Sequence, residues 1–149
     1  MVTDENNFDE ARAAIDEGLA AGIEELHTEV LGTVLKNMDD GKDALGNKWR
    51  PITEETLRSR QTRTSSRDAL VDTGIFRSDI LATSDVSPSA LTGVIGSTKV
   101  FAPAHEFGAP ELGIPRRALF GPAGRYAADI APDIIGEEID TRLESAEVE

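Results

Sequence analysis

Residues 8–38 read FDEARAAIDEGLAAGIEELHTEVLGTVLKNM, and this stretch sets the architecture of the N-terminal part of the chain. Its apolar side chains recur at steps near three and four, which predicts one long amphipathic helix with a single stripe facing the core. The stripe comprises Phe8, Ile15, Leu19, Ile23, Leu26, Val30, Val34 and Met38. Asn7 followed by Glu10 is typical of an N-cap with a capping-box partner, so we expect the helix to begin there.

Gly18, Gly22 and Gly32 lie within this helix, where each costs up to about 1 kcal/mol relative to alanine. We therefore expect another helix to pack closely against them. Pro122 opens a C-terminal helix with its own apolar stripe. That second stripe comprises Tyr126, Ile130, Ile134, Ile135, Ile139 and Leu143.

Shorter elements are expected between the two long helices. Thr53, and then Asp72 or Thr73, are positioned to cap short helices. Residues 81–87 and 90–97, joined by Pro88-Ser89, predict a β-hairpin, and residues 100–108 predict a short helix with Pro103 in its first turn. The predicted fold class is α+β, with long N-terminal and C-terminal helices packed on a small antiparallel β-sheet and short connecting helices.

The length of 149 residues fits one domain, which we assign to residues 1–149. Residues 1–6 and 145–149 are expected to fray, and residues 58–67 to form a mobile arginine-rich loop. The chain has no Cys and two His, which excludes thiolate chemistry, Cys-ligated zinc and a multi-histidine metal site within one chain. No apolar run is long enough for a membrane span.

No nucleotide-binding, metalloprotease or hydrolase motif occurs, so we predict no catalytic residue, cofactor or metal site, and no enzyme. Residues 39–43, DDGKD, superficially resemble a calcium loop, but Arg50 stands where its bidentate Glu is required, so a plain turn is favoured. His105 and Glu106 are adjacent and would point apart on a helix. We expect His105 to cap or pack at the helix end before Gly108.

The net charge is −13, and Arg outnumbers Lys eleven to four. A high acidic charge maintains solubility when salt screens repulsion, so this composition favours a salt-adapted, halophilic host. Arg58, Arg60, Arg63 and Arg67 are the exception, because they form a basic cluster in an acidic chain. They could contact an acidic partner subunit, touch DNA, or balance the surface charge of the protein itself.

Four blocks of residues then occur in a recognisable order. The first is Gly46-x-x-Trp49-x-Pro51-Ile52, and the second runs from Leu70 through Asp72-Thr73-Gly74-Ile75 to Ile80. The third is Phe101-Ala102-x-x-His105-Glu106-Phe107-Gly108, and the fourth is Ile114-Pro115-x-Arg117-x-x-Phe120-Gly121. This order resembles the phage virion-morphogenesis or tail-completion family, over residues 46–121.

The resemblance implies a non-enzymatic structural subunit of the head–tail junction, or neck, of a tailed virus. An acidic member would suit a virus of a halophilic archaeon, made in the host cytoplasm and carried in the virion. The resemblance also implies a homo-oligomeric ring, with a hexamer favoured, around the DNA channel. Its partners would be other neck, connector and tail proteins, with genomic DNA passing and not bound by sequence.

Within this interpretation two sets of residues are singled out. The candidate partner interface comprises Arg58, Arg60, Arg63, Arg67, Glu106, Phe107, Arg116 and Arg117. The structural motif comprises Trp49, Pro51, Thr73, Gly74, His105, Gly108, Pro115 and Phe120. Two alternatives remain at this stage: a tail-terminator ring capping the tail tube, and a small DNA-binding regulator that uses the arginines of residues 58–67.

Overall fold

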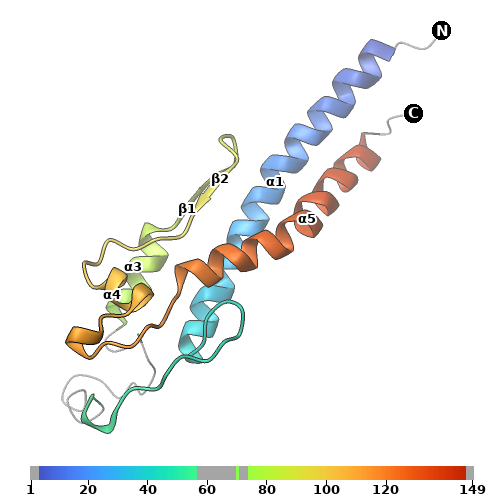
Figure 1. The fold of residues 1–149 in the computed structure, drawn as a ribbon. Helices are drawn as coiled ribbons and strands as arrows, with labels where there is room; N and C mark the ends of the chain where they lie inside the picture. The colour runs from blue at the N-terminus through green and yellow to red at the C-terminus, as the bar shows by residue number, and fades with distance from the viewer. Residues whose placement is uncertain (1–3, 57–69, 71–73, 147–149) are drawn as a thin grey trace. The chain divides into compact units, whose positions relative to one another are not determined.

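The computed structural model describes residues 4–56, 70 and 74–146, with side chains from residue 7 onward. Two long helices dominate the described chain, α1 (Asp4–Asp39) and α5 (Phe120–Ser145) (Figure 1). Between them lie α3 (Ile75–Thr83), strands β1 (Asp85–Ser87) and β2 (Thr92–Val94), α4 (Ala102–Phe107) and the 3₁₀ turn η1 (Pro110–Leu112). The α+β fold class is therefore confirmed.

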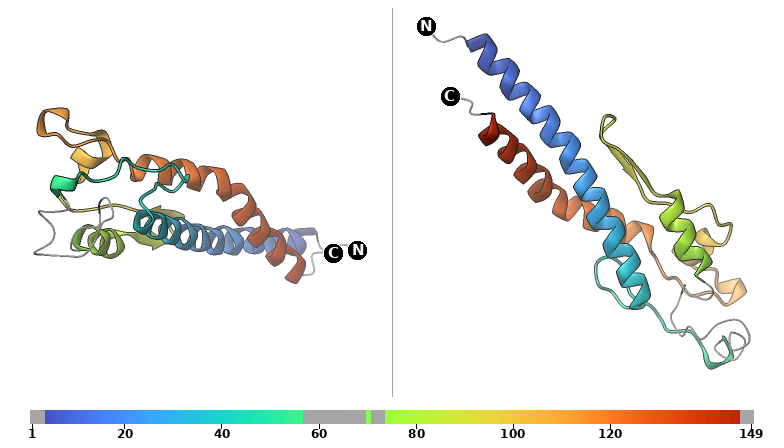
Figure 2. Two further views of the ribbon diagram at one scale, coloured as in Figure 1. Left: turned by 90° about the horizontal axis from the view of Figure 1, so that it is seen from below. Right: turned by 180° about the vertical axis from the view of Figure 1, so that it is seen from behind.

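These elements gather into two compact units, and both long helices contribute to each. The first unit comprises the described parts of residues 1–28, 86–94 and 127–149, and the second comprises those of 29–85 and 95–126. In the first unit α1 and α5 run antiparallel and side by side (Figure 2). No helix within the described ranges is both long enough and apolar enough to cross a lipid bilayer.

The contact between α1 and α5 in the first unit depends on two glycines. A Cβ atom at Gly18 would lie 2.6 Å from Ile139 Cα, and one at Gly22 would lie 3.0 Å from Ile135 Cα. The predicted close helix contact is confirmed at these two positions. It is wrong at Gly32, where a Cβ atom would meet no atom of the described residues within 4 Å.

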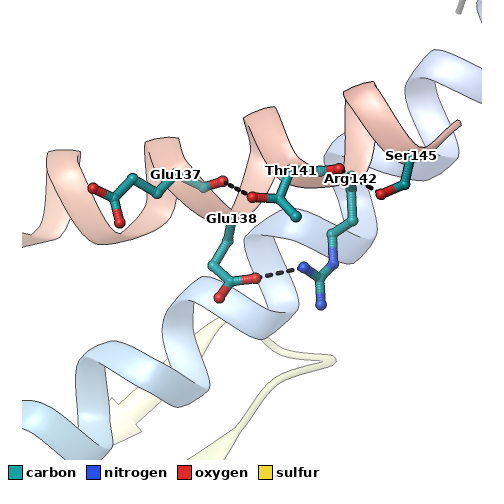
Figure 3. Close-up of polar contacts among 5 residues, drawn as sticks. All are labelled: Glu137, Glu138, Thr141, Arg142 and Ser145. Atoms are coloured by element: carbon teal, nitrogen blue, oxygen red, sulfur yellow. Dashed lines mark hydrogen bonds and ion pairs between the residues drawn. The ribbon is translucent and has the colours of Figure 1, made fainter. Parts of the chain in front are cut away.

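The C-terminal turns of α5 are supported from within the helix. Arg142 pairs with Glu138 one turn earlier at 2.5 Å, and the hydroxyl groups of Thr141 and Ser145 donate to the carbonyl oxygens of Glu137 and Thr141 (Figure 3). Such i,i+4 pairs each add a few tenths of a kcal/mol to a helix. The predicted apolar stripe of α5 is half-buried along its length, with no member fully enclosed by the described residues.

The β-hairpin is shorter than predicted. β1 and β2 have three residues each and are joined by residues 88–91. Leu81 belongs to α3 and not to a strand, because α3 continues to Thr83 with Phe76 and Ile80 on its buried face. The hairpin is tied to α1 where His27 Nε2 donates to the Val94 carbonyl oxygen at 3.1 Å.

Helix starts also differ from the sequence prediction. Asn7 does not cap α1, because the helix already includes Asp4.

Thr53 is confirmed as a cap, since its Oγ1 accepts the Thr56 N–H at 3.2 Å. The residue before α3 is Gly74, at φ +83°, a left-handed conformation that glycine adopts without strain. Asp72 and Thr73 lie outside the described residues.

The core lies in the second unit. Its largest fully buried side chains are Val34, Met38, Ile80 and Pro122. Asp43 is buried too, in the turn after α1, where its carboxylate accepts the backbone N–H groups of Leu45 and Asn47. The acidic turn thus uses this carboxylate to fold its own backbone, as a plain turn would.

Candidate functional site

The first and last of the four sequence blocks are tied together in the second unit. The Trp49 indole N–H donates to the Ala118 carbonyl oxygen at 3.0 Å. In the opposite direction, the Arg117 guanidinium donates to the carbonyl oxygens of Arg50 and Pro51 at 2.7 and 3.2 Å. These side-chain-to-backbone hydrogen bonds therefore hold together two segments that are about 67 positions apart in the sequence.

Glu106 makes a second set of side-chain-to-backbone hydrogen bonds inside this unit. Its carboxylate accepts the backbone N–H groups of Leu119 and Phe120 at 2.7 Å each, and that of Gly121 at 3.1 Å. These N–H groups belong to the start of α5 and have no partner within a helix, and the positive end of the helix dipole favours a carboxylate there. Glu106 is the helix cap that joins α4 to α5.

The prediction that Glu106 and Arg117 face a partner is therefore wrong. Both side chains are buried, and Arg117 is only 6% exposed. Within the described part of the chain, both side chains bind backbone groups of distant segments, which a local sequence pattern does not reveal. Arg116 is exposed, and its Nε donates to the Glu106 carbonyl oxygen at 3.1 Å. Phe107 is also exposed, so these two residues remain available to a partner.

The link from α4 to the fourth block passes through Gly108, at φ +78°. A Cβ atom there would lie 3.2 Å from the Arg116 backbone nitrogen, so both the backbone conformation and the close approach require glycine. Backbone hydrogen bonds join the two segments on either side of Gly108. Arg117 N donates to His105 O at 2.7 Å, and Ala109 and Ile114 form an antiparallel β-bridge.

His105 packs in an aromatic cluster, as the sequence prediction allowed. Its ring is stacked on Phe76 and lies edge-on to Phe101, with centroids 6.4 and 6.0 Å away. Its Nδ1 atom is buried and has no hydrogen-bond partner among the described residues. Burial, and then the positive charge of Arg117, lower the pKa of His105 below its usual 6.5, so the neutral imidazole is favoured. The Glu106 carboxylate is turned to α5, so the two residues form no acid–base pair.

A groove of about 1030 Å³ opens beside this cluster. Its walls combine the first, third and fourth blocks with the start of α3, and they include Pro51, Pro115, Gly108 and His105 of the predicted motif. Three large apolar side chains that line it are exposed, namely Ile75 at 55%, Phe101 at 40% and Phe107 at 76%. Exposed apolar surface of this kind marks a binding surface.

Asp79 is a structural carboxylate that sequence reasoning missed. It accepts the hydroxyl groups of Ser97 and Thr98 and the Thr98 backbone N–H. These hydrogen bonds, that from Ser97 first, lower the pKa of Asp79 to about 2. The bonds cross 18 residues of sequence, so periodicity gave no signal for them. Asp79 orients the segment that enters α4.

Four of the predicted interface residues cannot be placed against this groove. Arg58, Arg60, Arg63 and Arg67 lie outside the described residues, as does Thr73 of the predicted motif. Phe120 is half-buried and begins α5. Among the residues that are placed, no three His, Asp or Glu side chains gather closely enough to hold a metal ion.

Comparison with protein-family models, curated proteins and solved structures finds no match for this chain. The site must therefore be interpreted from its own geometry. It consists of an open apolar groove and of the segments around it. Those segments are held together by hydrogen bonds between buried charged side chains and backbone groups.

Proposed function

We propose that this chain is a structural subunit of the head–tail junction of a tailed virus, and that it acts by assembling into a ring. The observation that carries the proposal is the convergence of the sequence blocks in one unit. Trp49 and Arg117 join the first block to the fourth, and Glu106 joins the third to the fourth. Three of the four blocks that resemble the tail-completion family are thus joined by hydrogen bonds.

The chemistry of the site favours binding over catalysis. The buried carboxylate of Glu106 and the buried guanidinium of Arg117 are engaged with backbone groups. His105 lies between aromatic rings with its neutral form favoured. What the unit presents outward is apolar surface, at Phe107 and Ile75 beside the groove. A surface of this kind gains free energy when another protein covers it.

The partner best suited to repeat this contact is another copy of the chain. A contact between two different patches, repeated with a closing rotation, generates a ring. The acidic composition would let duplex DNA pass through such a ring without adhering, because like charges repel. The resemblance favours a hexamer.

The test is the mass of the purified full chain in molar salt, measured by size-exclusion chromatography with light scattering. We expect a closed oligomer whose mass is a small multiple of 16.0 kDa, and ring-shaped particles in electron micrographs. A monomer at every concentration would contradict the proposal. Tight binding to duplex DNA that weakens steeply as salt rises would instead support the DNA-binding regulator.

A further inference from the structure

The charge of the chain is divided unevenly between the two units. In the sequence, residues 1–28, 86–94 and 127–149 hold 16 acidic and two basic residues, a net charge of −14. Residues 29–85 and 95–126 hold 12 acidic and 13 basic residues, a net charge of +1. The net charge of −13 on the whole protein therefore originates in the first unit.

The acidic side chains of the first unit lie at its surface. Among the described side chains of that unit, every Asp and Glu is exposed except Glu138, which is half-buried and pairs with Arg142 on the same helix. The exposed carboxylates number six on α1 and five on α5. The two arginines of this unit, Arg12 and Arg142, are too few to neutralise them. The two antiparallel helices therefore pair against the repulsion of like charges.

Little apolar burial opposes this repulsion. The buried described residues of the first unit are Ala14, Gly18 and Gly22, and none of its described large apolar side chains is fully buried. The second unit encloses Met38 and Ile80 completely. Burial stabilises in proportion to the apolar area removed from water, so the first unit gains less free energy per residue than the second.

We propose that ionic strength controls the pairing of α1 and α5 in the first unit. The helices pair in molar salt and separate in dilute salt, while the second unit stays folded in both. Packed helices lie about 8–10 Å apart. The screening length is about 30 Å at 0.01 M salt and about 3 Å at 1 M, so repulsion between the two helices acts in dilute salt and is screened in molar salt. This inference is independent of the proposed ring.

The helices of the first unit depend on each other for their structure. Gly18 and Gly22 each cost α1 up to about 1 kcal/mol relative to alanine, and Pro132 removes a hydrogen bond from within α5. Most helical stability in proteins comes from packing of the apolar face, so separated helices of this composition unwind. Their backbone N–H groups then exchange with solvent, which gives a local measure of the pairing.

Hydrogen exchange of the full chain, measured by mass spectrometry at about 0.01 M and about 1 M sodium chloride, tests the proposal. We expect residues 8–28 and 127–145 to exchange at least tenfold faster in dilute salt. α3 of the second unit should exchange alike in both, and the fluorescence of Trp49, the single tryptophan, should not change. Potassium and tetramethylammonium chloride should protect as well as sodium chloride, because screening depends on ionic strength and not on the cation.

Two variants with equal changes in charge show where the effect originates. Each replaces three exposed carboxylates by amides of nearly the same size. The test variant changes the first unit, by Asp133→Asn, Glu137→Gln and Asp140→Asn. The control variant changes the second unit, by Asp40→Asn, Glu54→Gln and Glu111→Gln. We expect the test variant to reach half of its full protection at no more than half the salt concentration that the wild type needs, and the control variant to match the wild type.

Three results would overturn the inference. One is a first unit that stays protected in dilute salt, since repulsion then does not separate the helices. Another is loss of protection in both units at the same salt concentration, because the response would then belong to the whole chain. The third is protection by one cation alone, or an equal effect of both variants, since neither follows from screening of the charges on the first unit.

Discussion

The two units of this chain hold themselves together differently. In the first unit the buried described residues are small, namely Ala14, Gly18 and Gly22. At the two glycines the backbone of α1 lies directly against Ile139 and Ile135 of α5. In the second unit Val34, Met38 and Ile80 form an ordinary apolar core, and buried charged side chains bind backbone across it.

The two units therefore depend on different interactions for their stability. Close helix approach depends on the absence of two side chains, so it is sensitive to added volume. A core with buried charged groups depends on hydrogen bonds that are costly to leave unmade. The unit with the second kind of stability also carries the groove, so the proposed binding surface lies on the unit that has the apolar core.

The largest effect should follow Glu106→Ala. The change leaves three N–H groups at the start of α5 without their acceptor, one of them at the buried Leu119. We expect a loss of about 3 kcal/mol in the free energy of unfolding, measured by chemical denaturation with Trp49 fluorescence. Glu106→Gln keeps an acceptor oxygen and should lose less. Equal losses in both variants would mean that packing, and not the cap, is responsible.

Gly18→Ala tests the other kind of stability. The added Cβ atom would lie 2.6 Å from Ile139 Cα, so backbone must move in the first unit. Overpacking costs about 1–3 kcal/mol, partly offset by the better helix propensity of alanine. We expect circular dichroism at 222 nm to show a larger shift in the unfolding midpoint than Trp49 fluorescence does. Identical shifts would show that the two units unfold together, and would contradict the proposed difference in what stabilises them.

The helices of both units could be predicted from the sequence, because apolar periodicity and glycine placement are local signals. The stripe from Phe8 to Met38 predicted α1, and Gly18 and Gly22 predicted its close neighbour. Thr53 was recognisable as a cap because its partner is three residues away.

The polar contacts of the second unit could not be predicted in this way. Glu106 binds residues 13 to 15 positions away, and Arg117 binds residues 66 and 67 positions away. Both were predicted to face a partner, whereas charged side chains can be buried when they are paired. The pairing depends on which segments the fold brings together. Phe107 lies in one of the predicted blocks, whereas the groove beside it also involves residues outside the blocks and has no sequence signature of its own.

Acidification should weaken the second unit through His105. Its pKa is lowered in the folded state, so the unfolded chain binds a proton at higher pH than the folded chain does. The stabilising contribution is present above about pH 6.5 and is lost as the pH falls through and below that value. Unfolding midpoints followed by Trp49 between pH 7.5 and 5.5 should decline. His105→Phe should flatten the decline, and His27→Gln, which changes the other histidine, should retain it.

The smallest effect should come from Gly32→Ala, a matched control for Gly18→Ala on the same helix. Gly32 is exposed, and in the part of the chain that the structure describes no atom would lie within 4 Å of the new methyl group. We expect a gain of up to about 1 kcal/mol from helix propensity alone, measured by thermal unfolding. A destabilising result would indicate that another molecule packs at Gly32 and that α1 is covered there.

Phe107 on the groove wall directly follows Glu106, whose carboxylate holds the first turn of α5. We expect that a ligand which moves the α4 backbone at Phe107 also moves the Glu106 carboxylate that caps α5. Amide hydrogens of Leu119, Phe120 and Gly121 would then exchange with solvent at a different rate when the groove is occupied. The amide exchange rates at the start of α5 would therefore report whether the groove is occupied, without a label at the groove itself.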